Sequence, residues 1–368
     1  MCDDTLIDLS QKETAMLFTR LDEVTPQLLT LIFKEHGILN TQQVTTIRLL
    51  EAAETKEGER GSFLVHYDDV RALKNAPRRI FMKINKPNAE WGAKEVRFYQ
   101  DIAPQMFKRY RPQDFPVIPC HVAEYEPESG YSFVILDDIS EHFKPARNGQ
   151  PLSQFHYEKV MEGLGHLHAY WWNNAHLTDH AELPTAEALD KQLEAYQASY
   201  AAFKAHMLDL GRLGVGQQQV LEAVVSKWPH SFRERLLAGK DVTLIHRDTH
   251  PNNFMYAPRE VKIVDWQNWR LGMGTTDLAY FIACFAPDNI RKFQEKRLVQ
   301  RYYDTLLRLG VKNYTWDACW DDYRASIGRC IAFLLNAWTP DWLRDDRWLR
   351  AERAIKAFEE LDGLSLYA

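Results

Sequence analysis

Hydrophobic and polar residues are arranged in two different ways along this chain. Up to about residue 138, short apolar runs rich in branched side chains are separated by polar turns, which is typical of β-strands. Beyond that point, apolar residues recur every three or four positions, which is typical of amphipathic helices. The pattern predicts an α+β protein with a small lobe at residues 1–138 and a larger, mostly helical lobe at residues 139–368.

The first lobe is expected to hold a small antiparallel sheet flanked by helices. Thr25 and Pro26 have the residue types of an N-cap and first turn, for a helix that Gly37 ends. A polar segment with two glycines at 56–62 is interpreted as the turn between the first two strands, and a helix is expected at 89–103. The predicted strands are 44–50, 63–67, 79–84 and 131–136.

Helical periodicity dominates the second lobe, with one interruption. Two short apolar strands, 242–246 and 261–264, enclose a polar loop. The helices predicted around this interruption are 153–173, 186–208, 217–238, 276–286, 290–309, 316–337 and 345–361.

Composition narrows the function classes. The chain has 368 residues and a net charge of −6, which argues against a dedicated nucleic-acid binder, and its apolar content of 45% excludes wholesale disorder. No run of about 18 apolar residues could span a membrane, and the acidic N-terminus does not read as an export signal. The five cysteines are scattered, which favours reduced thiols. A cytoplasmic protein with no nucleic-acid or membrane partner is expected.

The polar loop carries the residue types of a catalytic site. Asp248 and Asn253 lie in the loop, and Asp265 ends the strand that follows it. Strand and loop ends can bring these three side chains together. An amide and a carboxylate oxygen are ligands suited to Mg²⁺, and a further carboxylate beside the metal can accept a proton from a hydroxyl.

The order of these residues resembles a known catalytic loop. The spacing His-x-Asp-x-x-x-x-Asn (His246, Asp248, Asn253), followed by Asp265, is similar to that of protein-kinase-like phosphotransferases, in the form found in aminoglycoside phosphotransferases, choline kinases and ecdysteroid kinase-like enzymes. Trp266-Gln267 replaces the Phe-Gly of protein kinases, which favours the small-molecule branch. The resemblance implies a bilobal protein-kinase-like fold.

The resemblance extends into the first lobe. Lys83 stands where the family has the lysine that binds the nucleotide's α- and β-phosphates, and Glu95 resembles the helix glutamate that pairs with it. The strand at 131–136 looks like the hinge whose backbone reads adenine. The segment at 58–62 lacks the Gly-x-Gly-x-x-Gly pattern but is expected to approach the phosphates. The nucleotide-binding residues implied in this way are Lys83, Glu95, Gly61, Ser62, Leu136 and Asp138.

Three other polar residues have a structural interpretation. His246 follows two apolar residues and is expected to brace the loop by hydrogen bonding. His168 lies on an apolar helix face and is expected to be a core histidine. Asp277 resembles the aspartate in the segment that buttresses the catalytic loop, and it is expected to be structural.

The resemblance implies a phosphotransferase with an alcohol group as acceptor. Such an enzyme moves the γ-phosphate of ATP (GTP is possible) to a hydroxyl of a small non-protein molecule. Asp248 would be the base, and Asn253 and Asp265 would hold Mg²⁺.

Two alternatives remain open at this point. His246, Asp248 and His250 alternate along the chain and could form the metal site of a hydrolase. The chain could also be a catalytically inactive kinase-like binding protein. The sequence leaves the acceptor and the oligomeric state open. The pocket is expected from residues 150–240 and the C-terminal helices, where four acidic residues could bind an amine or simply be solvated: Asp317, Asp321, Asp322 and Asp341.

Overall fold

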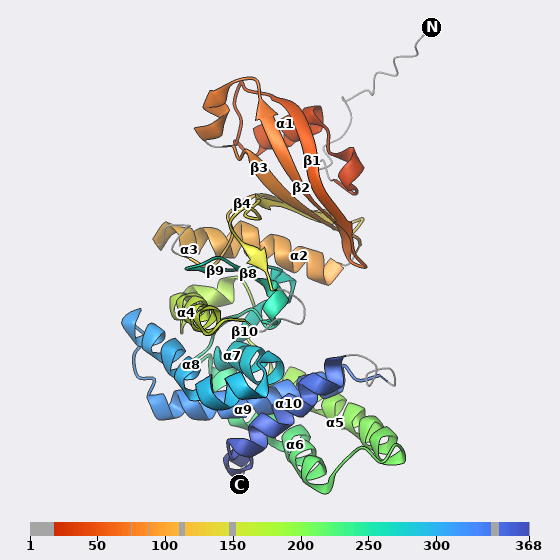
Figure 1. The fold of residues 1–368 in the computed structure, drawn as a ribbon, viewed down its shortest axis with the longest axis vertical. Coiled ribbons are helices and arrows are strands. Elements are labelled where there is room, and N and C mark those ends of the chain that lie inside the picture. The colour runs from red at the N-terminus through yellow and green to blue at the C-terminus, as the bar shows by residue number, and fades with distance from the viewer. Residues whose placement is uncertain are drawn as a thin grey trace. The chain divides into compact units, whose positions relative to one another are not determined.

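The computed structural model describes residues 18–74, 76–87, 89–109, 115–146, 152–339 and 346–367 (Figure 1). The chain divides into two compact units: an N-terminal unit of residues 1–104 and 118–141, and a C-terminal unit of residues 105–117 and 142–368. Residues 105–117, expected in the first lobe, belong to the C-terminal unit because they bond to it. The carbonyl of Phe115 accepts from Lys262 Nζ at 2.7 Å, and Val117 bridges to Ile263.

The N-terminal unit is built on one antiparallel sheet, with strand order β1-β2-β3-β5-β4. The four strands predicted from the sequence are present. β4, which contributes an edge of the sheet, was not predicted because its run of apolar residues is short and mixed with polar ones. The strands are β1 (Val44–Glu54), β2 (Gly58–Tyr67), β3 (Arg79–Asn85), β4 (Cys120–Tyr125) and β5 (Ser132–Asp137).

The turn that the sequence predicted at 56–62 is shorter, so that prediction is wrong. The turn closes at Thr55, whose backbone N–H donates to the Gly58 carbonyl at 2.8 Å, and β2 begins at Gly58. Gly61 and Ser62 therefore lie inside a strand that is paired on both sides. The glycine at 61 serves packing, because an added Cβ would lie 2.9 Å from the side chain of Leu21.

Helices cover the N-terminal sheet. α1 (Pro26–Glu35) begins as predicted, with Thr25 Oγ accepting from the backbone N–H of Leu28 at 3.2 Å. The helix predicted at 89–103 is α2 (Ala89–Arg97) followed by a π-helical segment, Phe98–Ile102, and then α3 (Ala103–Arg109). Phe33 on α1 and other apolar side chains close the core against the sheet.

The C-terminal unit is mostly helical, as predicted. The helix predicted at 276–286 is short α7 continued by a π-helical segment, Tyr280–Phe285. The helices are α4 (Gln154–Trp171), α5 (Ala186–Asp209), α6 (Val215–Ala238), α7 (Thr275–Ala279), α8 (Asp288–Arg308), α9 (Trp316–Asn336) and α10 (Asp346–Glu360).

Short strands accompany these helices in the described part of the unit. They form a two-stranded ribbon, β7 with β10, and a three-stranded sheet in the order β6-β8-β9. The polar loop expected to be catalytic connects the ribbon to the small sheet. The strands are β6 (Lys144–Pro145), β7 (Thr243–Ile245), β8 (Phe254–Tyr256), β9 (Val261–Ile263) and β10 (Arg270–Gly272).

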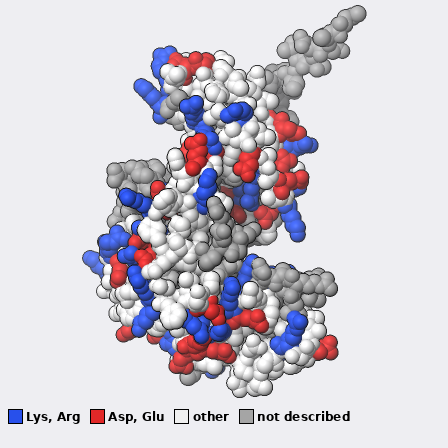
Figure 2. All heavy atoms as spheres, viewed as in Figure 1, with Lys and Arg blue, Asp and Glu red and all other residues white. Residues whose placement is uncertain are grey.

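The surface mixes both charges. On the face shown in Figure 2, basic and acidic side chains are intermingled over the helical unit. Among the described residues, Cys120, Cys284, Cys319 and Cys330 are free thiols, and Cys2 lies outside the described residues. None of the described helices has the length and apolar character needed to cross a bilayer.

Candidate active site

The polar loop between β7 and β8 is held by His246. Its imidazole is buried and lies edge-on to the ring of Trp266, with centroids 4.8 Å apart. Nε2 lies 2.9 Å from the carbonyl oxygen of Val264, and Nδ1 accepts from the backbone N–H of Asp248 at 3.3 Å. Because one nitrogen must donate and the other accept, the ring is the neutral Nε2–H tautomer. His246 thus braces the loop against the strand that leads to Asp265, as the sequence indicated.

The carboxylate of Asp277 fixes the start of the loop. Its two carboxylate oxygens accept from the backbone N–H groups of His246 at 2.7 Å and Arg247 at 2.8 Å. Its carbonyl accepts from Thr249 Oγ1 at 2.7 Å, and His168 Nε2 lies 3.3 Å from Oδ2. Asp277 and His168 are both fully buried. The structural interpretation of these two residues therefore fits the geometry.

Two residues beside the site have left-handed backbone conformations. Arg247 has φ +73° and Asp265 has φ +69°. Such conformations are costly for residues other than glycine and persist where surrounding bonds enforce them. Here the surrounding bonds are those from the side chains of His246 and Asp277 to the backbone. These bonds hold the main chain of the loop in one shape.

Hydrogen bonds of this loop connect the segments that carry Asp248, Asn253 and Asp265. Asn253 Nδ2 donates to the carbonyl of Asp248 at 2.8 Å, and the backbone N–H of Val264 donates to the carbonyl of Asn253 at 3.0 Å. Burial lowers the pKa of His250, and the charges of Asp248 and Asp265 both act in the opposite direction. His250 Nε2 lies 3.7 Å from Asp248 Oδ2, and Asp265 is near enough to act on His250 through its charge.

The set has the chemistry of a site for a hard divalent cation. Because the amide nitrogen of Asn253 is used by the loop, its oxygen is the atom left for a ligand. Asp265 adds a half-buried carboxylate one residue beyond Val264, and partial exposure leaves room for water ligands. The side chain of Asp248 is 29% exposed, so a substrate hydroxyl can reach it.

The geometry does not favour the metal site of a hydrolase. Both ring nitrogens of His246 are engaged with the backbone, so the ring cannot join Asp248 and His250 around a metal. Across the described ranges, no three His, Cys, Asp or Glu side chains gather in a metal-binding cluster.

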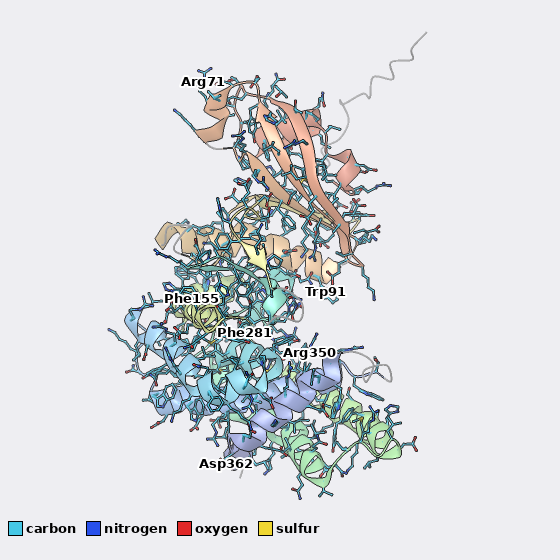
Figure 3. The ribbon with its side chains drawn as sticks, in the orientation of Figure 1. Arg71, Trp91, Phe155, Phe281, Arg350 and Asp362 are labelled. Carbon is cyan, nitrogen blue, oxygen red and sulfur yellow. The ribbon has the colours of Figure 1, made fainter. Side chains whose placement is uncertain are left out.

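Aromatic side chains of the π-helical segment lie near His250 and Asp248. The ring of Phe285 lies 6.0 Å from that of His250 and 5.2 Å from that of Tyr280. Burial raises the pKa of Tyr280, and the charge of Asp248 acts in the same direction, which places the two groups near each other. The guanidinium of Arg350, labelled on α10 in Figure 3, lies 4.8 Å from the centre of the Phe285 ring.

The N-terminal unit contains the expected lysine–glutamate pair. Lys83 Nζ on β3 lies 2.8 Å from Glu95 Oε2 on α2, and the two side chains are only 6% and 2% exposed. Asn85 Nδ2 lies 3.4 Å from the same carboxylate oxygen and 3.1 Å from Ser132 Oγ. Burying two charges is favourable only when they are paired and hydrogen-bonded. The pair therefore fixes the position of the ammonium group.

The other residues implied in nucleotide binding have backbone or structural roles. Leu136 lies in β5, paired on both sides, and the backbone N–H of Asp138 donates to the carbonyl of Arg79 at 3.3 Å. The carboxylate of Asp138 forms an ion pair with the Arg79 guanidinium at 2.8 Å. Gly61 and Ser62 use their main chain in strand pairing rather than in a phosphate-binding turn. A role for any of these four in nucleotide binding remains a prediction.

The acidic residues considered for an amine have other partners. Asp322 is buried, accepts from Arg235 Nη1 at 2.9 Å and from Tyr314 Oη at 2.8 Å, and has a pKa raised by burial. Asp321 pairs with Arg324 on the surface of α9, and Asp317 is exposed. Asp341 lies outside the described residues.

Solved structures with the same fold are phosphotransferases. A candidate aminoglycoside phosphotransferase from Ralstonia eutropha superposes with a TM-score of 0.55 at 15% identity, over 92% of this chain and 97% of that one. The choline kinase of Cryptosporidium parvum gives 0.53 at 12% identity, over 92% and 97%. A spectinomycin phosphotransferase solved with ADP and spectinomycin gives 0.50 at 13% identity, over 94% and 98%. The chain has the protein-kinase-like fold of small-molecule phosphotransferases, as the sequence indicated.

The sequence itself identifies the branch. The profile of the ecdysteroid kinase-like family matches residues 73–312, about two thirds of the chain, and the protein belongs to that family. No curated protein matches it in a sequence comparison.

Sequence reasoning missed the residues that reach the site from distant elements. Arg350 lies about a hundred residues beyond Asp248 and has no motif around it. Phe285 and Tyr280 meet the loop because a π-helical segment rotates the end of the predicted helix, a distortion that is common at functional sites and carries no sequence signature.

Proposed function

We propose that this protein is a nucleotide- and Mg²⁺-dependent kinase of a small hydroxylated molecule. The family and the fold support phosphoryl transfer in general. The observation that carries the specific proposal is the loop of Asp248 and Asn253. The side chains of His246 and Asp277 hold this loop, and it hydrogen-bonds to Val264, the residue before Asp265.

Each of these residues has a definite task in the proposed reaction. Asp248 orients the acceptor hydroxyl and takes its proton as the oxygen bonds to the γ-phosphorus, while the bond from phosphorus to the leaving nucleoside diphosphate breaks. Asn253 and Asp265 hold Mg²⁺. The cation, when bound, neutralises charge on the phosphate oxygens. Lys83, oriented by Glu95, binds the nucleotide phosphates as a point charge.

ATP is the proposed phosphate donor, with GTP as a possible substitute. The spectinomycin phosphotransferase of the same fold was solved with ADP, which supports an adenine nucleotide here. The proposed acceptor site lies in the helical unit, near the aromatic group around Asp248.

The test has two stages. Binding of ATP and GTP, each with and without Mg²⁺, is first measured by thermal shift, and hydroxylated metabolites are then screened for consumption of the bound nucleotide. Asp248→Asn should lower kcat by about 10²- to 10⁴-fold, because it removes the base and leaves the loop intact. Asp209→Asn, on the exposed end of α5, is the matched control and should leave kcat unchanged.

Two results contradict the proposal. Equal turnover by the Asp248→Asn enzyme shows that the base is elsewhere. Nucleotide binding without transfer to any alcohol identifies a kinase-like binding protein instead.

A further inference from the structure

A cavity of about 190 Å³ lies within the C-terminal unit, on one face of the β7–β10 ribbon. Residues of α5, α6 and α9 form its other walls. Most of the lining is apolar: Leu189, Phe232, Leu236, Ile245, Leu271 and Met273. Its size exceeds the roughly 150 Å³ that holds a benzene ring in an engineered protein cavity, and it is smaller than a pocket for a drug-sized ligand. A compact, ring-sized group fits these dimensions.

Cations outnumber anions among the charged residues of the cavity. Arg270 and Arg329 both line it, whereas Glu182 is its one acidic residue and is exposed. Arg329 is only 7% exposed. Within the described ranges, no carboxylate lies at ion-pair distance from Arg270. Guanidinium groups in an apolar wall bind carboxylates strongly, because the pairing is charge-assisted and water is largely excluded.

The cavity adjoins the catalytic loop. Ile245, in its wall, pairs with Arg270 in the ribbon and precedes Asp248 by three residues. Three residues span at most about 11 Å, so the base lies within about that distance of the cavity wall. Gln192, also in the wall, donates to Tyr196 at 3.1 Å.

The loop and the cavity also share electrostatic neighbours. Burial raises the pKa of Tyr196, and the charges of Arg329 and Arg247 both act against this shift. Tyr196 thus lies near an arginine of the cavity and near the arginine of the loop.

We propose that this cavity receives the carboxylate end of the acceptor, so that the substrate is a hydroxylated acid with a compact apolar body. The inference rests on the proposed kinase function and adds the acceptor's charge and size. An amine is disfavoured, since the two arginines outnumber the exposed Glu182.

Three probes of one shape and different charge test the preference directly. They are 4-(hydroxymethyl)benzoate, the neutral 4-(hydroxymethyl)benzamide and the cationic 4-(hydroxymethyl)benzylamine. Binding to the whole protein is measured by calorimetry, with and without Mg²⁺ and ADP. The carboxylate should bind at least about tenfold more tightly than the amide, and the amine should bind most weakly. Equal affinities, a preference for the amine, or binding of none of the three overturns the inference.

Variants assign the preference to the cavity. Arg270→Gln and Arg329→Gln should each remove most of the difference between carboxylate and amide. Arg233→Gln is the matched control, because Arg233 lies on α6 and pairs with Asp190. If the buried Arg329→Gln variant fails to fold, the half-buried Arg270 still supplies the test. A carboxylate preference that survives Arg270→Gln contradicts the assignment.

Transfer assays separate this inference from the kinase proposal. Phosphorylation of the carboxylate probe, with a KM raised about tenfold or more by Arg270→Gln and not by Arg233→Gln, supports both. Transfer to a neutral or cationic alcohol in preference to the acid overturns the inference and leaves the kinase function standing. Preferential binding of the carboxylate with transfer to no alcohol overturns the kinase function, and with it the role of the bound acid as acceptor.

Discussion

The two units hold their charged groups in place in different ways. In the N-terminal unit, Lys83 and Glu95 are buried and position each other through their side chains. In the C-terminal unit, the side chain of Asp248 is 29% exposed, and its place is set by main-chain bonds to His246 and Asp277. The first arrangement depends on a pair of charges, and the second on the fold of a loop. Substitutions should therefore affect stability in one unit and loop geometry in the other.

The largest expected effect on stability is the loss of one partner of the buried pair. Lys83→Met leaves the carboxylate of Glu95 buried without its main counter-charge, which should lower the free energy of unfolding by about 3–5 kcal/mol. Denaturant titration measures this change. The double variant Lys83→Met/Glu95→Met should recover most of the loss, because a hydrophobic pair of similar volume can replace a buried ion pair. No recovery in the double variant would show that the pair is not the cause.

A smaller effect is expected from the buttress of the catalytic loop. Asp277→Asn replaces one accepting oxygen with a donor that faces a backbone N–H, which should cost about 1.5–3 kcal/mol. It should also lower kcat, because one of the two backbone N–H groups, that of His246 or that of Arg247, loses its acceptor and the loop is held less firmly. Denaturant titration and turnover assays, with Asp209→Asn as control, check both expectations. A stability loss with full activity would mean that the loop keeps its shape without this carboxylate.

The pH dependence of stability should reveal the environment of His250. Burial lowers its pKa in the folded protein below the usual 6.5, so the unfolded chain binds the proton first as the pH falls. Stability should therefore decrease as the pH drops from about 6.5 towards the folded-state pKa. At pH values well above 6.5 this group should contribute no change in stability. His250→Gln should flatten that decrease between about pH 7.5 and 5.5, measured by denaturation at each pH. Parallel curves for the two proteins would exclude His250 as the source.

The smallest effect on stability is expected for an exposed ion pair, which serves as the control for the buried pair of Lys83 and Glu95. Lys86 lies just beyond β3, three residues from Lys83, and pairs with Glu54 at 3.1 Å with both side chains largely exposed. Lys86→Met should change the free energy of unfolding by less than about 1 kcal/mol, because solvent and salt screen an exposed pair. A change as large as that of Lys83→Met would contradict the distinction between buried and exposed pairs.

The sequence was informative wherever a pattern repeats locally. Helices such as α5 and α9 follow the apolar periodicity to within a residue or two, and Thr25 marks the start of α1. The turn at 56–62 was misplaced because its charged residues lie on half-exposed positions of a strand, where charge is tolerated. Glu59, for example, accepts from the backbone N–H of Leu21 at 2.8 Å.

The residues of the candidate site also differ in whether a local sequence pattern indicates them. Asp248, Asn253 and Asp265 lie close together in sequence and in one motif, so spacing alone indicates them. Arg270 and Arg329 belong to different elements and meet only across a cavity, which no local pattern announces. Tertiary structure was needed to see the charge of the proposed acceptor pocket.

The left-handed backbone at Asp265 also has a practical consequence. Asparagine tolerates that conformation almost as well as aspartate, whereas most other residues would distort it. Asp265→Asn therefore offers a way to remove one negative charge without disturbing the main chain. Such a variant is a natural choice for trapping the protein with an intact nucleotide and its acceptor, so that crystals of the stalled complex can be grown.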